Sequence, residues 1–504
     1  MGNCHSGALA FVPMAGTVTL DGRSLTIADV IAVARRNVSV ALDQKMLQAV
    51  GESRKTVEAA VTRGQTIYGV NTGFGKLAHV RIPPEQARQL QLNLIRSHAS
   101  GVGDPLNVEA VRAMMLLRAN VLMRGTSGVR PVLPELLAEM LNRGVHPRVP
   151  SQGSVGASGD LAPLSHLALA MIGEGDDGRA LTAQGLKAIT LEPKEGLAFV
   201  NGTQAQTGLA ALLVSDSWTL WRAAHAAAAM SLEAVRGSPD PFDARIHDAR
   251  PHPWQQRSAA LLRDLLADSE IRESHRENDP RVQDAYSLRC TPQVLGAVGE
   301  GLAFAERLVT TELNAATDNP LVFGDDVLSG GNFHGQPIAL ALDVIAIALT
   351  TLAGLAERRL ERVVNPDLSS GLPAFLARDP GLESGFMTAQ IAAAALVADC
   401  RVLATPASVQ SIPTEGNQED IVPMGMSAAW KAQRILGNAE RIIAIELLAG
   451  AQGLEYLKPL RPAKAVARVY GAVRQDSAPL TGDRPLTADI ETVAADIRAG
   501  RFAS

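Results

Sequence analysis

Residues 153–160 (GSVGASGD) form a loop of small residues that can do unusual backbone chemistry. Ala157, Ser158 and Gly159 follow one another at its centre. Because glycine has no Cβ, the amide nitrogen of Gly159 can be compressed onto the carbonyl carbon of Ala157 in a strained turn, and Ser158 can lose its hydroxyl group as water. Cyclisation and dehydration would leave an exocyclic methylidene, which is a strong electrophile made without any exogenous cofactor.

Three other functions for this loop are weaker. It lacks the Lys-Ser/Thr pair of a P-loop, and its G-x-x-G-x-x-G spacing differs from the dinucleotide-binding G-x-G-x-x-G. A serine hydrolase would use Ser158 with His166, but the second glycine of the nucleophile elbow G-x-S-x-G comes one place early here. A tight connection before a helix that starts near Leu161 remains the purely structural alternative.

A second glycine-rich loop, residues 68–75 (YGVNTGFG), opens with Tyr68. Three glycines in eight positions let the backbone take positive φ angles and approach a ligand closely. The whole chain has only four tyrosines, so we treat Tyr68 and Tyr286 as candidate site residues.

The composition indicates a soluble globular protein. The chain has 504 residues, is 46% hydrophobic and 20% charged, and carries a net charge of -5, which excludes a disordered chain and a basic nucleic-acid-binding protein. Three widely spaced cysteines support neither a disulfide framework nor a cysteine-based zinc cluster, and the histidines lack metal-ligand spacing. We therefore predict no metal, no nucleic-acid partner and a cytoplasmic location.

No segment predicts membrane insertion. The most apolar stretch, residues 338–356, is interrupted by Asp343 and followed by charged residues, so we predict a buried helix. Residues 1–6 (MGNCHS) match a short lipidation pattern, which we rank below a simple disordered start.

The elements that must position the two loops change in character along the chain. Residues 17–22 predict a hairpin, residues 26–29 a capping box with a helix to about Arg36, and residues 83–97 a helix that opens at a proline pair. Long alanine- and leucine-rich helices are predicted over 208–235, 294–313, 336–363, 388–404 and 427–455. Helices that are apolar on more than one face need neighbours beyond their own chain, so we expect an oligomer.

These patterns predict a mainly α protein in three parts. The parts are a disordered start over residues 1–16, an N-terminal mixed α/β domain over 17–205 that carries the reactive loop, and a central helical bundle with a C-terminal helical region over 206–504.

Seven segments together resemble the aromatic amino-acid ammonia-lyase family, and its histidine-cleaving members in particular. They are residues 68–75 (YGVNTGFG), 96–101 (RSHASG), 153–166 (GSVGASGDLAPLSH), 201–204 (NGTQ), 283–290 (QDAYSLRC), 329–334 (SGGNFH) and 417–420 (NQED). The resemblance extends from about residue 17 to 460. It implies the fumarase/aspartase-like superfamily architecture and a homotetramer whose active sites draw on more than one subunit.

The resemblance also implies the chemistry. The family's prosthetic group is 4-methylidene-imidazole-5-one (MIO), which it forms from the residues matching Ala157, Ser158 and Gly159. The implied reaction is non-oxidative loss of ammonia from an L-amino acid. Tyr68 would be the base that removes the β-proton, and Asn201 and Tyr286 would form hydrogen bonds beside the prosthetic group.

Substrate-binding roles are implied by the same resemblance. Arg289 would hold the α-carboxylate through two parallel hydrogen bonds, and Phe333 would pack near the prosthetic group. Histidine-cleaving members carry Ser-His where this chain has Ser97 and His98. Glu419 can accept the imidazole N–H of a substrate, so L-histidine, converted to trans-urocanate as the first step of histidine degradation, is the predicted substrate.

Departures beside the site leave alternatives open. Ile421 and Pro423 stand where histidine-cleaving members usually show His and Ser, Gly335 and Gln336 replace Ala and Glu, and Ala285 precedes Tyr286 without the common proline. The near alternative is a tyrosine or phenylalanine ammonia-lyase, or a 2,3-aminomutase, that uses the same MIO. A catalytically inactive helical scaffold is a further alternative.

Overall fold

A computed structural model describes residues 14–277 and 279–503 of the chain. The lipidation pattern, residues 1–6, lies wholly outside this range. The expected disordered start, residues 1–16, lies outside it except for residues 14–16. Within the described residues the structure is mainly helical, with three two-stranded sheets, which confirms the prediction of a mainly α fold.

The strands are β1 (Met14–Leu20), β2 (Val38–Leu42), β3 (Val102–Pro105), β4 (Pro150–Gln152), β5 (Leu321–Phe323) and β6 (Asp326–Leu328). The α-helices before residue 203 are α1 (Ile27–Arg36), α2 (Gln44–Thr62), α3 (Ala87–His98), α4 (Val108–Met123), α5 (Val132–Asn142), α6 (Leu161–Met171), α7 (Gly175–Ala183) and α8 (Glu195–Val200).

The later helices are α9 (Gln204–Ala234), α10 (Ala244–Asp248), α11 (Pro253–Leu265), α12 (Glu270–Glu273), α13 (Tyr286–Arg289), α14 (Thr291–Glu312), α15 (Gln336–Val364), α16 (Met387–Leu403), α17 (Gly425–Glu455), α18 (Lys464–Asp476) and α19 (Thr487–Arg498). Short 3-10 turns are η1 (Gly75–Leu77), η2 (Pro84–Gln86), η3 (Asp240–Phe242), η4 (Ala374–Leu376) and η5 (Glu415–Asn417).

The chain divides into two compact units. The first comprises the residues up to Leu212 together with Glu306–Leu342 and Pro406–Trp430, and the second comprises Leu213–Ala305, Asp343–Thr405 and Lys431–Ser504. Four of the boundaries fall within the long helices α9, α14, α15 and α17, and the fifth falls just after α16. The three-part division at residues 16 and 205 stays a prediction.

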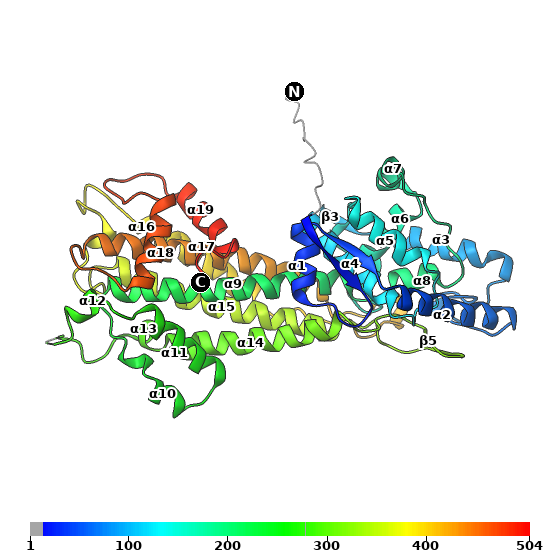
Figure 1. Ribbon diagram of the computed structural model, residues 1–504, viewed down its shortest axis with the longest axis horizontal. Helices are drawn as coiled ribbons and strands as arrows, with labels where there is room; N and C mark the ends of the chain where they lie inside the picture. The colour runs from blue at the N-terminus through cyan, green and yellow to red at the C-terminus, as the bar shows by residue number, and fades with distance from the viewer. Residues whose placement is uncertain (1–13, 278, 504) are drawn as a thin grey trace, which may run out of the picture. The chain divides into compact units, whose positions relative to one another are not determined.

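The predicted hairpin over residues 17–22 is wrong. β1 and β2 are parallel, and α1 lies between them in the sequence, as Figure 1 shows. The carboxylate of Asp21 closes a local turn by accepting hydrogen bonds from the backbone N–H groups of Arg23 and Ser24 at 2.7 and 2.8 Å. The chain therefore enters a helix directly after the turn, and a strand that comes after such a crossover returns in the parallel direction.

The start of α1 has the predicted capping box. The Thr26 hydroxyl accepts a hydrogen bond from the Asp29 N–H at 3.2 Å, and the Asp29 carboxylate accepts one from the Thr26 N–H at 3.0 Å. These two bonds satisfy backbone donors that the first helical turn leaves free. α1 and α4 pack together beside the β1–β2 sheet (Figure 1).

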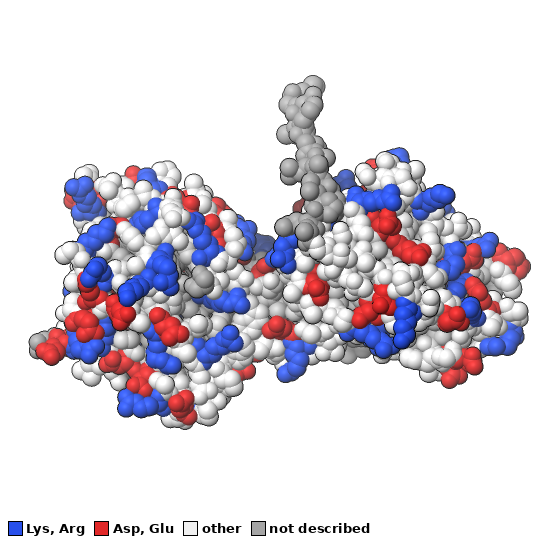
Figure 2. Space-filling model, viewed as in Figure 1, with Lys and Arg blue, Asp and Glu red and all other residues white. Residues whose placement is uncertain are grey.

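The five predicted long helices are present with ends shifted by at most four residues. By length and composition, α15 is the one described helix that could cross a membrane, but 67% of its most apolar stretch is buried inside the protein. This burial agrees with the prediction of a buried helix. On the face shown in Figure 2, Lys and Arg side chains are interspersed with Asp and Glu.

Candidate active site

A pocket of about 440 Å³ in the first unit brings together six of the predicted site residues. They are Tyr68, Ala157, Ser158, Asn201, Phe333 and Glu419. These residues come from the two glycine-rich loops, from the end of α8, and from the loops before α15 and α17. Segments far apart in the sequence thus line one cavity.

The loop before α6 is held by backbone hydrogen bonds to three other segments. Gly202 O accepts from the Asp160 N–H at 2.7 Å, Gly156 O accepts from Gly335 at 3.0 Å, and Val155 O accepts from Met424 at 2.9 Å. The loop therefore keeps a single position against its neighbours.

Only glycine fits at position 159. Its φ is +81°, and a Cβ built there would lie 2.3 Å from both the nitrogen and the oxygen of Gly202. Ala157 is buried, and Ser158 lines the pocket. This close cradle suits the compression that joins Gly159 to Ala157, so residues 157–159 fit the MIO group.

His166 is not placed to act as the base of a serine hydrolase. His166 Nε2 accepts a hydrogen bond from the Gly101 N–H at 3.2 Å. No hydrogen bond joins His166 to Ser158 in the described part of the chain, so the pairing that would activate a serine is absent there.

Tyr68 is held by its own loop. Its hydroxyl oxygen accepts a hydrogen bond from the Gly75 N–H at 2.9 Å, and its ring meets Phe74 edge-on at 6.4 Å. Burial raises the pKa of Tyr68; the Gly75 N–H lowers this pKa, and the carboxylates of Glu415 and Glu419 raise it further. The Gly75 N–H therefore favours a tyrosinate, but the net shift raises the pKa of Tyr68 and opposes one.

Glu419 presents an unused acceptor. Its Oε2 accepts a hydrogen bond from the Thr414 hydroxyl at 2.5 Å, while its Oε1 is buried and has no partner among the described residues. A buried carboxylate oxygen without a donor is costly, because it loses water and gains nothing in return. A substrate N–H would satisfy it.

Ser97 and His98 lie at the end of α3 and do not line the pocket. The Ser97 hydroxyl is 3.0 Å from His98 Nδ1 and also donates to the Leu94 carbonyl at 3.1 Å. Burial lowers the pKa of His98, and the charge of Glu419 raises it. His98 therefore feels the charge of Glu419, and no hydrogen bond between these two side chains is seen among the described residues.

Tyr286 and Arg289 lie in the second unit, on the single turn α13. They share one helical turn, and the Arg289 guanidinium lies 4.6 Å from the centre of the Tyr286 ring. Neither residue lines the pocket of the first unit. Tyr286 is 69% exposed, and Arg289 Nε is buried without a partner among the described residues.

Sequence reasoning gave no site role to six polar residues that line the pocket, which are Asn319, Ser329, His334, Glu415, Gln418 and Asp420. Glu415 reaches the pocket because a backbone bridge joins Thr414 to Glu419 and closes the intervening chain into a tight loop. Gly416 and Asn417 take φ angles of +61° and +67° in that loop. A Gly-Asn pair favours such a turn, and this was the available signal.

Comparisons with known proteins agree with this geometry. The family model described as aromatic amino acid lyase matches residues 25–475. A protein of Koribacter versatilis named histidine ammonia-lyase is 51% identical over 96% of this chain and 98% of its own length.

Solved structures show the same fold. The tyrosine aminomutase of Streptomyces globisporus superposes with a TM-score of 0.92 at 40% identity, over 97% of this chain and 98% of that one. The histidine ammonia-lyase of Trypanosoma cruzi has a TM-score of 0.89 at 43% identity, over 96% and 94% of the two chains. With the reactive tripeptide, Tyr68 and Glu419 gathered in one pocket, these matches show that the chain belongs to the aromatic amino acid lyase family, whose members depend on MIO.

Proposed function

We propose that this protein removes ammonia non-oxidatively from L-histidine and releases trans-urocanate, the first step of histidine degradation. The observation that carries the proposal is the match, over nearly the whole chain, to relatives named histidine ammonia-lyase. The unpartnered Glu419 Oε1 in the pocket supports it, because an imidazole N–H is the donor that this oxygen lacks.

Residues 157–159 would form the MIO group in the cradle that Gly202 provides. When present, the group supplies an electrophile for the substrate's amino group, so that nitrogen becomes a better leaving group. The chain's own residues do the remaining work, and no exogenous cofactor is required.

Proton removal falls to Tyr68. Its oxygen faces the same pocket as Ser158, and the Gly75 N–H holds the phenol in one orientation. Asn201 comes directly after α8, and its side-chain amide lies 3.5 Å from the Asn319 carbonyl. Asn201 and Tyr286 would form hydrogen bonds beside the prosthetic group, where fixed dipoles stabilise developing charge.

The pocket needs a cation that its own lining does not supply. Three carboxylates line it, those of Glu415, Glu419 and Asp420, and no Lys or Arg is among the described lining residues. An α-carboxylate would be repelled there unless a guanidinium met it. Arg289 fills this role in the proposal, contributed within a homotetramer whose sites are shared between subunits.

Side-chain recognition would involve Glu419 directly, with Phe333 packing beside the ring. Ser97 and His98 would act from the end of α3, through the electrostatic effect between His98 and Glu419. We expect the enzyme to work in the cytoplasm without a membrane or nucleic-acid partner.

A substrate panel tests the function. Purified protein is incubated with L-histidine, L-tyrosine and L-phenylalanine, and the ultraviolet spectra of the products are recorded, with Ser158→Ala as the control that cannot form MIO. Urocanate absorbance from the wild type alone supports the proposal. If the protein deaminates another amino acid but forms no urocanate, the substrate assignment is rejected.

A 2,3-aminomutase is the second candidate, because the tyrosine aminomutase structure superposes so closely. Chromatography of the same reactions decides between the two. A β-amino acid product would favour the aminomutase, whereas the unsaturated acid alone favours the lyase.

A further inference from the structure

Arg118 is a guanidinium buried completely inside the first unit. It lies on α4 with no exposed surface, and burial lowers its pKa to about 10. Its Nη1 donates to the carbonyl oxygens of Ala198, Phe199 and Asn201 at 3.0, 3.0 and 2.6 Å. Burying a charge carries a large desolvation penalty unless fixed partners compensate it, so the position of Arg118 needs an explanation.

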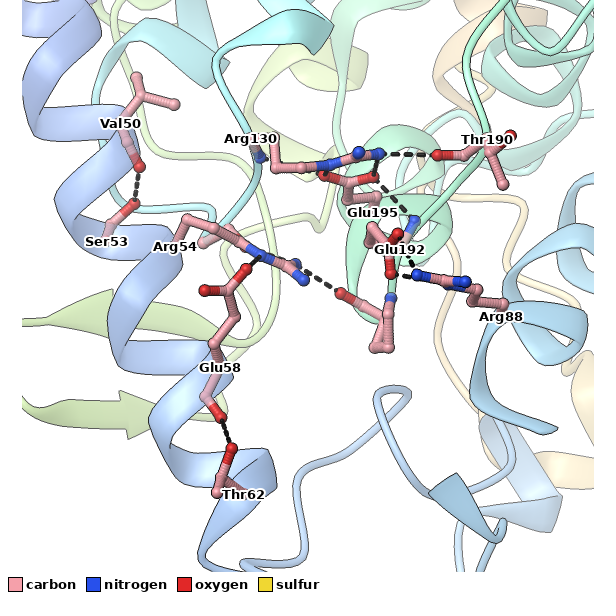
Figure 3. A network of polar contacts seen from close by, with 12 residues as sticks. Val50, Ser53, Arg54, Glu58, Thr62, Arg88, Arg130, Thr190, Glu192 and Glu195 are labelled. Carbon is pink, nitrogen blue, oxygen red and sulfur yellow. Dashed lines mark hydrogen bonds and ion pairs between the residues drawn. The ribbon is translucent and has the colours of Figure 1, made fainter. Parts of the chain in front are cut away.

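Those carbonyl groups belong to the end of α8 and the residue directly after it. The last carbonyls of a helix lack partners within the helix, and a cation there also complements the helix dipole. The other end of α8 is fixed as well, because Glu195 accepts hydrogen bonds from Arg130 Nε and Nη2 at 2.8 and 2.7 Å (Figure 3). The short helix α8 is therefore held at both ends.

The residue after Asn201 is the one that backs the reactive loop. Gly202 faces Gly159 through a backbone bridge and accepts the Asp160 N–H at 2.7 Å. A Cβ on Gly202 would lie 2.8 Å from Arg118 Nη2. Because a Cβ at position 159 would lie only 2.3 Å from Gly202, the position of the 201–202 backbone sets how closely Gly159 is confined.

Two nitrogen donors of the Arg118 guanidinium form no hydrogen bond with the described residues. Its Nε and Nη2 are buried and have no hydrogen-bond partner among the described residues. Asp160 and Asp318 attract its charge without bonding to it. The Arg118 side chain therefore binds backbone carbonyl groups, and it forms no contact ion pair with any described residue.

We propose that Arg118 is a positioning residue for the formation of the prosthetic group: it fixes residues 201 and 202 as a rigid backing, so that the Gly159 nitrogen is pressed onto the Ala157 carbonyl carbon. The inference rests on the proposed function, since it concerns how the MIO group is made. A displacement of about 1 Å is enough to slow a positioned reaction by roughly two orders of magnitude.

The covalent change balances without an oxidant or another reactant. A bond forms between the Gly159 nitrogen and the Ala157 carbonyl carbon, and the Ala157 oxygen leaves as water with the amide protons of Gly159 and Ser158. The Ser158 hydroxyl then leaves as a second water with the proton from its Cα. The chain should lose about 36 Da in total, since both losses are covalent changes that intact mass records.

Arg112 provides a matched control on the same helix. It is also buried, its pKa is also lowered to about 10 by burial, and it also donates to backbone carbonyls, those of Val33 and Leu141. These carbonyls lie on α1 and α5, away from α8 and the reactive loop. Arg112→Gln therefore reports the effect of losing a buried guanidinium without touching the backing of Gly159.

The test measures the intact mass of newly synthesised full-length protein over time in a cell-free reaction, for wild type, Arg112→Gln, Arg118→Gln and Arg118→Lys, with melting temperatures measured alongside. We expect Arg118→Gln to lose the two waters at least roughly tenfold more slowly than Arg112→Gln. Arg118→Lys, which keeps a charged donor, should recover part of the rate.

Equal rates for Arg118→Gln and Arg112→Gln would overturn the inference, whether both are fast or both are slow. If Arg118→Gln does not fold, Arg118→Lys decides: slowed loss in the folded protein supports the role, and the wild-type rate refutes it. A wild-type chain that never loses water would instead reject the proposed function itself, so the two failures are distinguishable.

Discussion

Two of the three carboxylates that line the pocket, those of Glu415 and Glu419, affect the pKa of the Tyr68 phenol, and their effects can be separated by mutation. Burial is the largest cause that raises the pKa of Tyr68, and Glu415 raises it more than Glu419 does. Burial and Glu419 in turn raise the pKa of Glu415. These charges oppose a tyrosinate, so a substrate that brings positive charge into the pocket would relieve them.

Glu415→Gln should therefore lower the pKa of Tyr68. A base works in its deprotonated form, so kcat/KM rises as the pH rises through its pKa, and the acid limb of the profile should move to lower pH. Asp420→Asn is the control, because Asp420 lines the same pocket but is not among the causes of the Tyr68 shift. A limb that stays in place, or that moves equally in both variants, would rule out this coupling.

Glu419→Gln tests recognition of the imidazole. Hydrogen bonds to a charged group contribute about 1.5–3 kcal/mol, so kcat/KM for L-histidine should fall roughly ten- to a hundredfold. Any residual turnover of L-phenylalanine, whose ring has no N–H to donate, should not fall. Steady-state kinetics on both substrates provide the internal control, and an equal loss on both would show that Glu419 acts on the fold of the pocket instead.

At the scale of single residues, the sequence predicted the side chains whose place is set by local loops. Ser158, Tyr68 and Glu419 reach the pocket as expected. Asn319 and Glu415 were missed, because their position depends on long-range packing and on a tight turn closed by one bridge. No spacing in the chain encodes those contacts directly.

At the scale of elements, a buried ion pair lies directly beside a residue that lines the pocket. Lys194, directly before α8, lies 3.0 Å from an Asp318 carboxylate oxygen, and both side chains are fully buried. Asp318 also accepts the Asn319 N–H at 2.6 Å, and Asn319 lines the pocket. The pair therefore connects the start of α8 to the segment before β5.

Lys194→Met should destabilise the protein by about 3–5 kcal/mol, because it leaves the Asp318 charge buried and unpaired. The double variant Lys194→Met/Asp318→Leu should recover much of that loss, since it removes both charges at similar volume. Urea unfolding of the single and double variants measures both free energies. A single variant as stable as the wild type would show that the pair contributes little.

The helices were predicted more accurately than the strands, for a physical reason. Long helices such as α9 and α15 bury repeating apolar residues, including many alanines, so their periodicity is visible over many turns. β1 is seven residues long, and its partner depends on the element that comes next in the chain. The turn at Asp21 leads into α1, which begins at the capping box of Thr26, so the strand that pairs with β1 comes only after this helix. Interpreting the turn by itself gave a hairpin, which is the wrong topology.

At the scale of the whole molecule, the pocket of one unit is chemically incomplete. It gathers Tyr68, Ser158 and Glu419, but among its described lining residues it has no cation for the substrate's carboxylate. Arg289, the predicted anchor, lies in the other unit. Assembly was predicted from the apolar faces of the long helices, but which subunit contributes which residue cannot be predicted from one sequence.

Mixing two inactive variants tests the shared site. Tyr68→Phe lacks the base and Arg289→Ala lacks the anchor, so each homo-oligomer should be inactive. If Tyr68 and Arg289 reach a site from different subunits, random co-assembly should place both intact residues in about a quarter of the sites, and this fraction of wild-type activity should return. Tyr68→Phe mixed with Ser158→Ala is the control, because both residues line the pocket of one chain and no site can regain both. Activity in the control mixture would show instead that Tyr68 and Ser158 come from different subunits. No activity in the first mixture would argue against Tyr68 and Arg289 reaching a site from different subunits.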